Sequence, residues 1–440
     1  AAFTASVQNK VVTVVNNSTG ATNYSWSFGD NSALDTNKNT THTYATNGGY
    51  KIVLTARNAL NSAKDSISVS INTGPQYQTV SGHITTNTTW TNNKIYRMDG
   101  FVYVDSNATL TIQPGTIVRG IKLTKGTLIV TRGGKLIADG TVNEPIIFTS
   151  DEVAGTRTFG DWGGIIILGS APINPVGGQA TIEGGVNNAA QDGQYGGTNA
   201  ADNSGILRYV RIEYGGIPFS ANNEINGLTM GGVGSGTTID YVMVSYNGDD
   251  SFEWFGGTVD CKHLIAYKGI DDDFDTDFGY RGNVQFGLSI RNENLSDAAG
   301  DSNCFESDND AQGSVAQPLT SPVFSNFTII GAKGNGTVSL PIGEKFEKAF
   351  RLRRNTATSV FNTIVTGWEK GLSIEGLPVE DNIIGDTMSF HSNILSNFNL
   401  NTVCITTTPG VLSAYFSQHA NDSVSAHSNI TWVTPFVPLG

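Results

Sequence analysis

The chain has 440 residues, more than one ordinary globular core accommodates, so we expect several domains or a domain beside a long repetitive region. Glycine is frequent (52 residues), only 15% of the residues are charged, and the formal net charge is −13. This composition favours an extracellular β protein rich in turns, and the acidic balance argues against nucleic acid and anionic membranes as partners.

The cysteines and the start of the chain bear on cellular location. Cys261, Cys304 and Cys404 are too few for a disulfide framework, so we expect buried free thiols. No apolar run approaches the ~20 residues of a transmembrane helix, and no charged-then-apolar signal sequence opens the chain. We therefore expect an exported protein, secreted or attached to the outer membrane, whose signal has been removed. A lipid anchor in the precursor is one way to attach it.

Residues 1–73 have the pattern of an antiparallel β-sandwich. Short runs that alternate apolar and polar residues are separated by turn-rich segments such as Asn16–Thr22 and Gly29–Thr40. The runs are Val11–Val15, Tyr24–Phe28, Tyr50–Thr55 and Ser66–Ile71. We predict that they form a separate domain, which a linker at Thr73-Gly74-Pro75 joins to the rest of the chain.

Two motifs in this region resemble the polycystic-kidney-disease (PKD) domain. The first is Tyr24-Ser-Trp-Ser-Phe-Gly-Asp30, and the second is His42-Thr-Tyr44, followed by Gly49 and an alternating strand. The resemblance implies an immunoglobulin-like spacer, which occurs on surface proteins and on secreted enzymes that degrade polysaccharide or protein. It also implies that Trp26 anchors the core and that Gly29-Asp30 forms a turn.

A longer β region occupies residues 77–440. We expect Tyr77–Thr86 and Lys94–Val104 to cap it, and short alternating runs ended by Gly, Pro or Asn follow. No segment of helical period is long enough to cross between parallel strands, so consecutive short strands are parallel only if the chain coils. The sequence therefore predicts a parallel β-helix with N-terminal capping strands and inserted loops.

Several later segments align with one another as successive coils. They are Leu207–Tyr214, Ile239–Tyr246, Cys261–Tyr267 and Val284–Ile290. The spacing between coils varies, which predicts insertions at Asp192–Ser204 and Asn292–Asn303.

The region resembles the right-handed parallel β-helix proteins of the pectate-lyase-like class over residues 105–400. The segments that carry the resemblance are Gly140-Thr141 with Glu144–Ser150, Gly160–Ile165 and Leu207–Gly216. The fold class that we expect is therefore all-β: an Ig-like sandwich followed by a right-handed, single-stranded parallel β-helix. The class contains lyases, hydrolases and adhesins, so the fold does not decide the function.

One motif recurs in three neighbouring coils. Asp249–Gly257 returns as Asp271–Gly279, and a shorter copy follows at Cys304–Asp308. Stacked coils place equivalent residues about 4.8 Å apart. We predict that Phe252, Phe274 and Phe305 stack inside the coils, and that the residue after each of them, Glu253, Asp275 or Glu306, points into a shared outer groove.

Carboxylates at this spacing repel one another, so they need a cation, a cationic ligand or bulk water. The candidate metal ligands are Glu253, Asp275, Asp277, Glu306 and Asp308. All are oxygen donors without a paired His or Cys, which favours Ca²⁺ over Zn²⁺. The alternative is a row of solvated turn residues.

The resemblance to pectate lyases implies that Ca²⁺ would be held by carboxylates on one wall and that an arginine or a lysine would act as the base. Arg351 and Arg353 follow Glu306 by about two coils and are the candidates for a base or an anion clamp. Asp249-Asp250 is a paired-aspartate motif of the polygalacturonase type. Because His263 lacks the flanking glycines of that family, we do not expect hydrolysis of that kind.

Aromatic residues lie beside the acidic copies. Trp254 and Tyr280 are candidate sugar-binding rings, together with Phe255 and Phe278, because aromatic rings stack on the apolar face of a pyranose. The alternative is that these rings fill the inside of the coils.

The sequence predicts an exported cell-surface or secreted protein that binds extracellular glycan or acts in adhesion and has no catalytic activity. The partner would be an extracellular polysaccharide, or a glycan or protein of another surface. The alternative function is degradation of polysaccharide, most plausibly by a Ca²⁺-dependent lyase that uses the acidic wall at residues 249–308.

Overall fold

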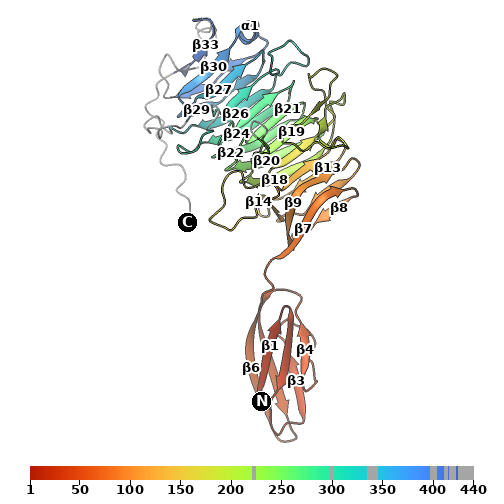
Figure 1. Cartoon of the computed structure of the whole chain (residues 1–440). Coiled ribbons are helices and arrows are strands. Elements are labelled where there is room, and N and C mark those ends of the chain that lie inside the picture. Colours follow the sequence, from red (N-terminus) through yellow and green to blue (C-terminus); the bar gives the residue numbers. More distant parts are fainter. Residues whose placement is uncertain are drawn as a thin grey trace. The chain divides into compact units, whose positions relative to one another are not determined.

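The computed structural model describes residues 1–220, 224–297, 302–333, 345–396, 404–410, 415 and 423–424. The chain divides into two compact units, Ala1–Gln76 and Tyr77–Gly440 (Figure 1). In the described residues the regular structure is β-strand, apart from one short α-helix, α1 (Leu377–Ile384). The predicted all-β fold class is therefore confirmed.

The N-terminal unit consists of two three-stranded antiparallel sheets. One contains, in order, β1 (Phe3–Gln8), β2 (Val11–Asn16) and β4 (Thr40–Thr43), and the other β3 (Asn23–Ser27), β5 (Gly48–Arg57) and β6 (Ser62–Ile71). Alternation along β2 buries Val12 and Val14 and turns their neighbours outwards. The inward residues of both sheets form one core around the fully buried Trp26, as expected of an Ig-like sandwich.

The residues of the two N-terminal motifs hold the sandwich together. Tyr44 donates its hydroxyl to the carbonyl of Phe28 at 2.9 Å, and the His42 ring stacks on the Phe28 ring with centroids 4.2 Å apart. Gly29 has a φ of +78°, and a Cβ there would lie 2.8 Å from the carbonyl oxygen of Lys51. The turn therefore needs glycine.

The second unit is a right-handed parallel β-helix with three sheet faces, the stacked arrows in Figure 1. The first face contains β8 (Thr88–Trp90), β10 (Thr109–Ile112), β13 (Lys135–Asp139), the N-terminal parts of β18 (Gly205–Glu213), β20 (Thr238–Ser245), β22 (Cys261–Tyr267), β24 (Asn283–Ile290) and β26 (Val323–Ile330), and then β28 (Ser359–Phe361) and β31 (Phe390–His391).

The second face continues from the first along the same long strands. It contains the N-terminal part of β9 (Lys94–Val104), β11 (Ile117–Gly120), β14 (Ile146–Ser150), the C-terminal parts of β18, β20, β22, β24 and β26, and then β29 (Ile364–Thr366), β32 (Ile394–Ser396) and β34 (Ser423–Val424). Each long strand bends between the two faces at a residue with φ between 50° and 65°: Tyr209, Tyr241, His263, Phe286 or Asn326.

The third face contains the C-terminal part of β9, then β12 (Thr127–Val130), β15 (Ile165–Leu168), β19 (Leu228–Val233), β21 (Phe252–Gly257), β23 (Phe274–Asp277), β25 (Phe305–Ser307), β27 (Lys348–Arg353), β30 (Lys370–Glu375) and β33 (Cys404–Thr406). The predicted capping strand Lys94–Val104 is thus β9 and already belongs to the coils. The other predicted cap is β7 (Gln76–Ile84), which pairs with β9.

A row of phenylalanines fills the inside of the third face. Phe252, Phe274, Phe305 and Phe350 are buried, and successive ring centroids are 5.5, 4.9 and 4.9 Å apart. The predicted three-ring stack is therefore confirmed, and Phe350 extends it. The row exists because parallel in-register strands give equivalent residues the same orientation.

The coils are interrupted by insertions and contain free thiols. The segment between β15 and β18 carries a hairpin of β16 (Ala180–Thr181) and β17 (Gln194–Tyr195). The three cysteines are free, and Cys261 and Cys304 are buried as expected, whereas Cys404 is only half-buried. In the described part of the chain, no helix has the length and apolarity that crossing a membrane requires.

Candidate acidic site and outer groove

Four residues on the outside of the third face form a row across consecutive strands. Glu253 of β21 pairs with Asp275 of β23, Asp275 with Glu306 of β25, and Glu306 with Arg351 of β27. Each follows an inward phenylalanine, so alternation along the strand turns it outwards. The predicted carboxylate ladder is present, and an arginine ends it. Arg351 lies one coil after Glu306 and not about two, because the long segment between β25 and β27 contains insertions and not a further coil.

The ladder opens into a cavity of about 260 Å³, which we call the acidic cavity. Its lining includes five of the predicted site residues: Glu253, Asp275, Glu306, Arg351 and Arg353. The other lining residues are Glu183, Glu224, Asn226, Asp249, Asp250, Asp271 and Asp272. Nine carboxylates therefore surround one cavity, and its only guanidinium groups in the described residues are those of the two arginines.

Two of these carboxylates, Asp250 and Asp272, form a second row across neighbouring coils. Asp250 and Asp272 each lie two residues before a phenylalanine of the inner row. The backbone N–H of Asp272 donates to Oδ1 of Asp250 at 2.9 Å, and that of Asn303 donates to Oδ1 of Asp272 at 2.5 Å. One oxygen of each carboxylate thus ties a coil to the next.

The inserted segment between β15 and β18 completes the cavity. The amide of Asn226 donates one hydrogen bond to Oε1 of Glu183 at 3.2 Å and a second, short one to Oε2 of Glu253. Glu183 lies 43 residues before Asn226 and Glu253 lies 27 residues after it, yet one amide bridges both carboxylates. Only the fold brings Glu183 to the ladder.

Burial controls the protonation of these groups. Burial, with added repulsion from neighbouring carboxylates, raises the pKa well above its usual range for Asp249, Asp250, Glu253, Asp272 and Asp275. Burial likewise raises the pKa of Asp271 to about 8. A raised pKa favours the protonated form of these carboxyl groups, so binding of a divalent cation would displace protons.

Two sets of carboxylates have the spacing of metal ligands. One oxygen from each of Asp249, Asp250 and Asp271 lies within 4.8 Å of the others, and the same holds for Asp250, Glu253 and Asp275. The donors are all oxygens, the set that Ca²⁺ prefers and that Zn²⁺ in proteins seldom uses alone. The residues present therefore fit Ca²⁺.

The arginine end of the cavity is already neutralised. Arg351 donates to Glu306 at 3.1 Å, and Arg353 donates to Asp308 at 2.8 Å and makes a further short contact with Glu306. Burial alone would lower the pKa of Arg353, but the adjacent Glu306 and Asp308 carboxylates raise it overall. Pairing with carboxylates stabilises the charged form of a guanidinium, which weighs against a role of these arginines as the base.

Two predicted metal ligands lie outside the cavity lining. Asp308 is paired with Arg353 and Arg354, the latter at 2.6 Å. The carboxylate of Asp277 accepts the backbone N–H of Phe278 at 2.6 Å. The repeat predicted correctly that Asp277 and Asp308 hold equivalent positions. It did not show that these positions lie outside the cavity, which covers only the first residues of each strand.

The expectation that Trp254 and Tyr280 present rings to a sugar is wrong. Both are fully buried inside the coils, where their rings stack with centroids 5.3 Å apart. Trp254 lies two residues after Phe252 in the same strand, so it shares the inward orientation of that residue. Phe255 is 8% exposed and packs 5.9 Å from Phe278 under the insertion.

The sequence contained a signal for some of the residues that we did not assign to the site. The pairs Asp249-Asp250 and Asp271-Asp272 precede the same phenylalanine row, so the repeat itself could have placed them beside Glu253 and Asp275. For Glu183 and Glu224 there was no such signal, because both lie in segments between strands.

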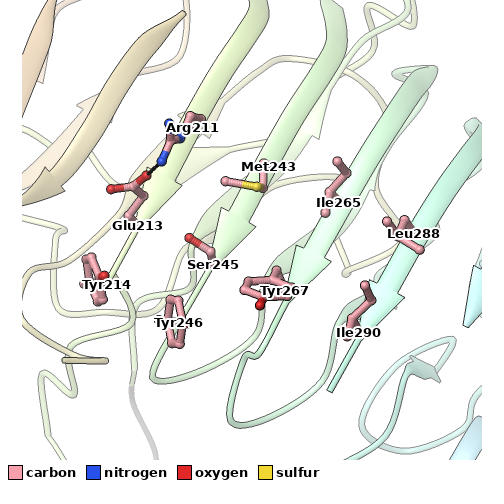
Figure 2. Close-up of a pocket in the computed structure, with 10 residues that line it drawn as sticks. All are labelled: Arg211, Glu213, Tyr214, Met243, Ser245, Tyr246, Ile265, Tyr267, Leu288 and Ile290. Carbon is pink, nitrogen blue, oxygen red and sulfur yellow. Dashed lines mark hydrogen bonds and ion pairs between the residues drawn. The ribbon is translucent and has the colours of Figure 1, made fainter. Parts of the chain in front are cut away.

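A second hollow lies on the outside of the second face, about 360 Å³ in volume, and we call it the outer groove. Figure 2 shows its ten lining residues on β18, β20, β22 and β24 and just beyond their ends: Arg211, Glu213, Tyr214, Met243, Ser245, Tyr246, Ile265, Tyr267, Leu288 and Ile290. We had aligned these four segments from the sequence, but we had not predicted a binding surface there.

The sequence matches two protein families, one for each unit. Residues 82–435 match the pectate-lyase-like β-helix domain, and this chain belongs to that family. Residues 3–72 match the PKD domain, which confirms the resemblance of the N-terminal motifs. Together the two matches fit a surface protein that binds or degrades glycan.

Comparison with other proteins adds one structure. The chain is similar to the Dettilon tailspike protein at 11% identity and a TM-score of 0.28, over 76% of this chain and 62% of the tailspike chain. The similarity thus spans less than two thirds of the tailspike. No curated protein matches the sequence.

Proposed function

We propose that this protein is exported to the cell surface or the surrounding medium, where it binds extracellular glycan without cleaving it. The acidic cavity is the proposed binding site, and Ca²⁺ is its proposed cofactor. The observation that carries the proposal is the gathering of nine carboxylates around one cavity whose two arginines already pair with Glu306 and Asp308. Attachment to the outer membrane through a lipid anchor, and a role in adhesion, belong to the same proposal.

Charge balance supports the cation. Coulomb repulsion between carboxylates is strong in a buried site, and it is relieved either by protons or by a bound cation. Asp250 belongs to both sets of closely spaced oxygens, so it is the proposed shared ligand between Asp249 and Asp271 on one side and Glu253 and Asp275 on the other. Because Ca²⁺ accepts six to eight oxygen ligands, sugar hydroxyls or carboxylates can complete its coordination.

Degradation of glycan is the second candidate function. It is favoured by the neighbouring carboxyl groups of raised pKa, since a protonated carboxyl beside an ionised one is the minimum equipment for cleaving a glycosidic bond. A Ca²⁺-dependent lyase would in addition need a base. The pairing of Arg351 and Arg353 with carboxylates weighs against that mechanism.

Binding and cleavage are separated by two measurements on the full chain. Binding of polygalacturonate and of alginate is followed by affinity electrophoresis with Ca²⁺ or with EDTA, and release of unsaturated uronides is followed by ultraviolet absorbance. We expect Ca²⁺-dependent retardation without release of uronide. Asp275→Asn should abolish the retardation, whereas Asp386→Asn, at an exposed residue with a φ of 58°, should preserve it.

Two outcomes of these measurements would contradict the proposal. Release of uronide that requires Ca²⁺ and Asp275 would establish the lyase and overturn the non-catalytic role. Retardation that EDTA and Asp275→Asn both leave unchanged would remove the acidic cavity from the binding site.

A further inference from the structure

The outer groove has an apolar floor between two rows of aromatic side chains. The floor is the row Met243, Ile265 and Leu288, which parallel pairing aligns across β20, β22 and β24. Arg211 begins this row on β18 and forms an ion pair with Glu213, drawn in Figure 2. Among the described residues no segment covers the floor, whose side chains are partly exposed.

One row of aromatic side chains stands at the bend between the first and second faces. The rings of Tyr209, Tyr241, His263 and Phe286 stack with centroids 4.5, 4.1 and 4.9 Å apart. Tyr241 and Phe286 are 40% and 45% exposed, and a hollow of about 460 Å³ lies between this row and the floor. Because the ring faces cover one another, the row presents ring edges and polar tips to a ligand.

The other row stands where the second face ends. The rings of Tyr214 and Tyr246 stack with centroids 5.4 Å apart, and Tyr267 meets Tyr246 edge-on at 5.7 Å. The hydroxyls of Tyr214, Tyr241 and Tyr246 have no hydrogen-bond partner in the described residues. Unpaired phenolic hydroxyls therefore stand on both sides of an apolar floor.

The backbone conformation at two of these tyrosines is unfavourable for a bulky residue. Tyr241 and Tyr246 both have a φ of 53°, in the left-handed region that bulky residues seldom adopt. At the bend of Tyr241, later coils use Asn326, with a φ of 62°, and Asn362, with a φ of 51°. At the bend of Tyr246, the next coil uses Lys268, with a φ of 57°. Asparagine adopts a positive φ with less strain than tyrosine does, so the backbone conformation alone does not explain the aromatic rings.

The charges of the groove select the class of ligand. Arg211 is paired with Glu213, so the floor has no net charge, while the chain as a whole has a formal net charge of −13. An acidic ligand would be repelled by the chain as a whole. The ammonium of Lys268 lies over the rings of Tyr267 and Tyr246, at 4.8 and 5.9 Å from their centroids, and not at the floor. An uncharged ligand with an apolar face and hydroxyl edges matches the floor and the tyrosine tips.

The spacing of the rows selects an extended polymer that runs along the helix axis. Each coil repeats the same apolar position every ~4.8 Å, which is close to the length of one pyranose in an extended glycan. The side chains on one face of an extended peptide recur every two residues, about 6.6 Å, and would fall out of register with the rows.

The area excludes a second copy of the chain as the occupant. Four coils and the six residues from Tyr241 to Tyr246 give a patch of about 14 Å by 17 Å, on the order of 240 Å². A stable protein interface buries about 800 Å² on each partner.

We propose that the outer groove is a binding site for an uncharged, extended polysaccharide, separate from the acidic cavity and independent of Ca²⁺. The pyranose rings lie on Met243, Ile265 and Leu288, and their hydroxyls exchange hydrogen bonds with Tyr241 and Tyr246. This inference rests on glycan binding as the proposed function but not on the cation, so the two sites fail or succeed separately.

The test is isothermal titration calorimetry of the full chain, in EDTA, with cellohexaose, xylohexaose, laminarihexaose and the acidic control hexagalacturonate. We expect at least one neutral hexasaccharide to bind and hexagalacturonate not to bind. The double variant Tyr241→Asn/Tyr246→Asn places at both bends a residue that tolerates a positive φ, and later coils already use it at the bend of Tyr241. It should weaken binding on the order of tenfold or more, since two phenolic hydroxyls are lost.

A second variant and two controls complete the design. Met243→Glu should also abolish binding, and its charge should be tolerated because Arg211 lies opposite in the register. Tyr77→Asn, at a tyrosine that is 53% exposed outside the groove, and Asp275→Asn, in the acidic cavity, should both bind like the unaltered chain. Circular dichroism and light scattering establish the fold and the oligomeric state of each variant.

Four results would overturn the proposal. They are absence of binding to all three neutral hexasaccharides, preference for hexagalacturonate, full affinity in both groove variants, and loss of binding in Asp275→Asn. A concentration-dependent dimer that the groove variants abolish would instead assign the groove to a second copy of the chain.

Discussion

Binding of Ca²⁺ to the acidic cavity should stabilise the β-helix, and Asp275→Asn should remove that stabilisation. Asp275 is the middle member of the ladder, between Glu253 and Glu306, and its pKa is raised by burial and then by Glu306 and Asp272. A cation that binds the folded chain but not the unfolded chain stabilises it by mass action. Replacing one ligand by a neutral amide weakens that binding and leaves the backbone unchanged.

The size of the effect follows from the size of the unit. At a Ca²⁺ concentration one hundred times the Kd, one site contributes about 2.7 kcal/mol. Unfolding entropy near 60 °C is about 2.1 cal/mol/K per residue, so the unit Tyr77–Gly440, of about 360 residues, unfolds with about 0.75 kcal/mol/K. The melting temperature should therefore rise by about 3.5 °C in the unaltered chain and by less than about 1 °C in Asp275→Asn.

Differential scanning calorimetry at pH 7.5, with EDTA and with a Ca²⁺ titration, measures this rise. In EDTA the variant should melt at or slightly above the temperature of the unaltered chain, because the amide removes a repelling carboxylate. Asp386→Asn, at an exposed residue, is the matched control and should keep the full rise. A melting temperature indifferent to Ca²⁺, or the same rise in Asp275→Asn, would refute the reasoning and leave the ladder as solvated surface.

Three further predictions concern pH and packing. Burial raises the pKa of Asp271 and of Asp277 to about 8, so the folded chain binds more protons than the unfolded chain between pH 3.8 and about 8. The stability of the Ca²⁺-free protein should therefore fall as the pH rises from 5 to 8.5 in calorimetry with EDTA, and a constant or rising stability would contradict the assigned burial. Trp26→Ala in a fragment of residues 1–76 should cost roughly 3–5 kcal/mol in urea unfolding, and a fragment that stays as stable would remove Trp26 from the core. Phe274→Ala should cost a similar ~3–5 kcal/mol in the β-helix. Phe274→Leu should cost less, because Leu228 and Leu372 occupy the same inner row.

The repeated motif predicted much of the fold because equivalent residues in successive copies become neighbours when the strands are parallel and in register. Phe252 and Phe274 hold one place in two copies of a motif, and the structure stacks their rings 5.5 Å apart. The same reasoning placed Glu253 beside Asp275. In the N-terminal unit the two motifs were sufficient because they pack on each other: the His42 ring stacks on Phe28, and the Tyr44 hydroxyl donates to the Phe28 carbonyl.

Features that do not recur with the repeat could be seen only in the tertiary structure. An insertion brings Glu183 to within reach of the amide that also binds Glu253, and no repeat marks that residue. Pairing of Arg353 with Asp308 removes two charged groups that the sequence left available. The outer groove depends on which side of each strand faces water and on what covers it, since solvent exposure is a property of the assembled coils and not of any one strand.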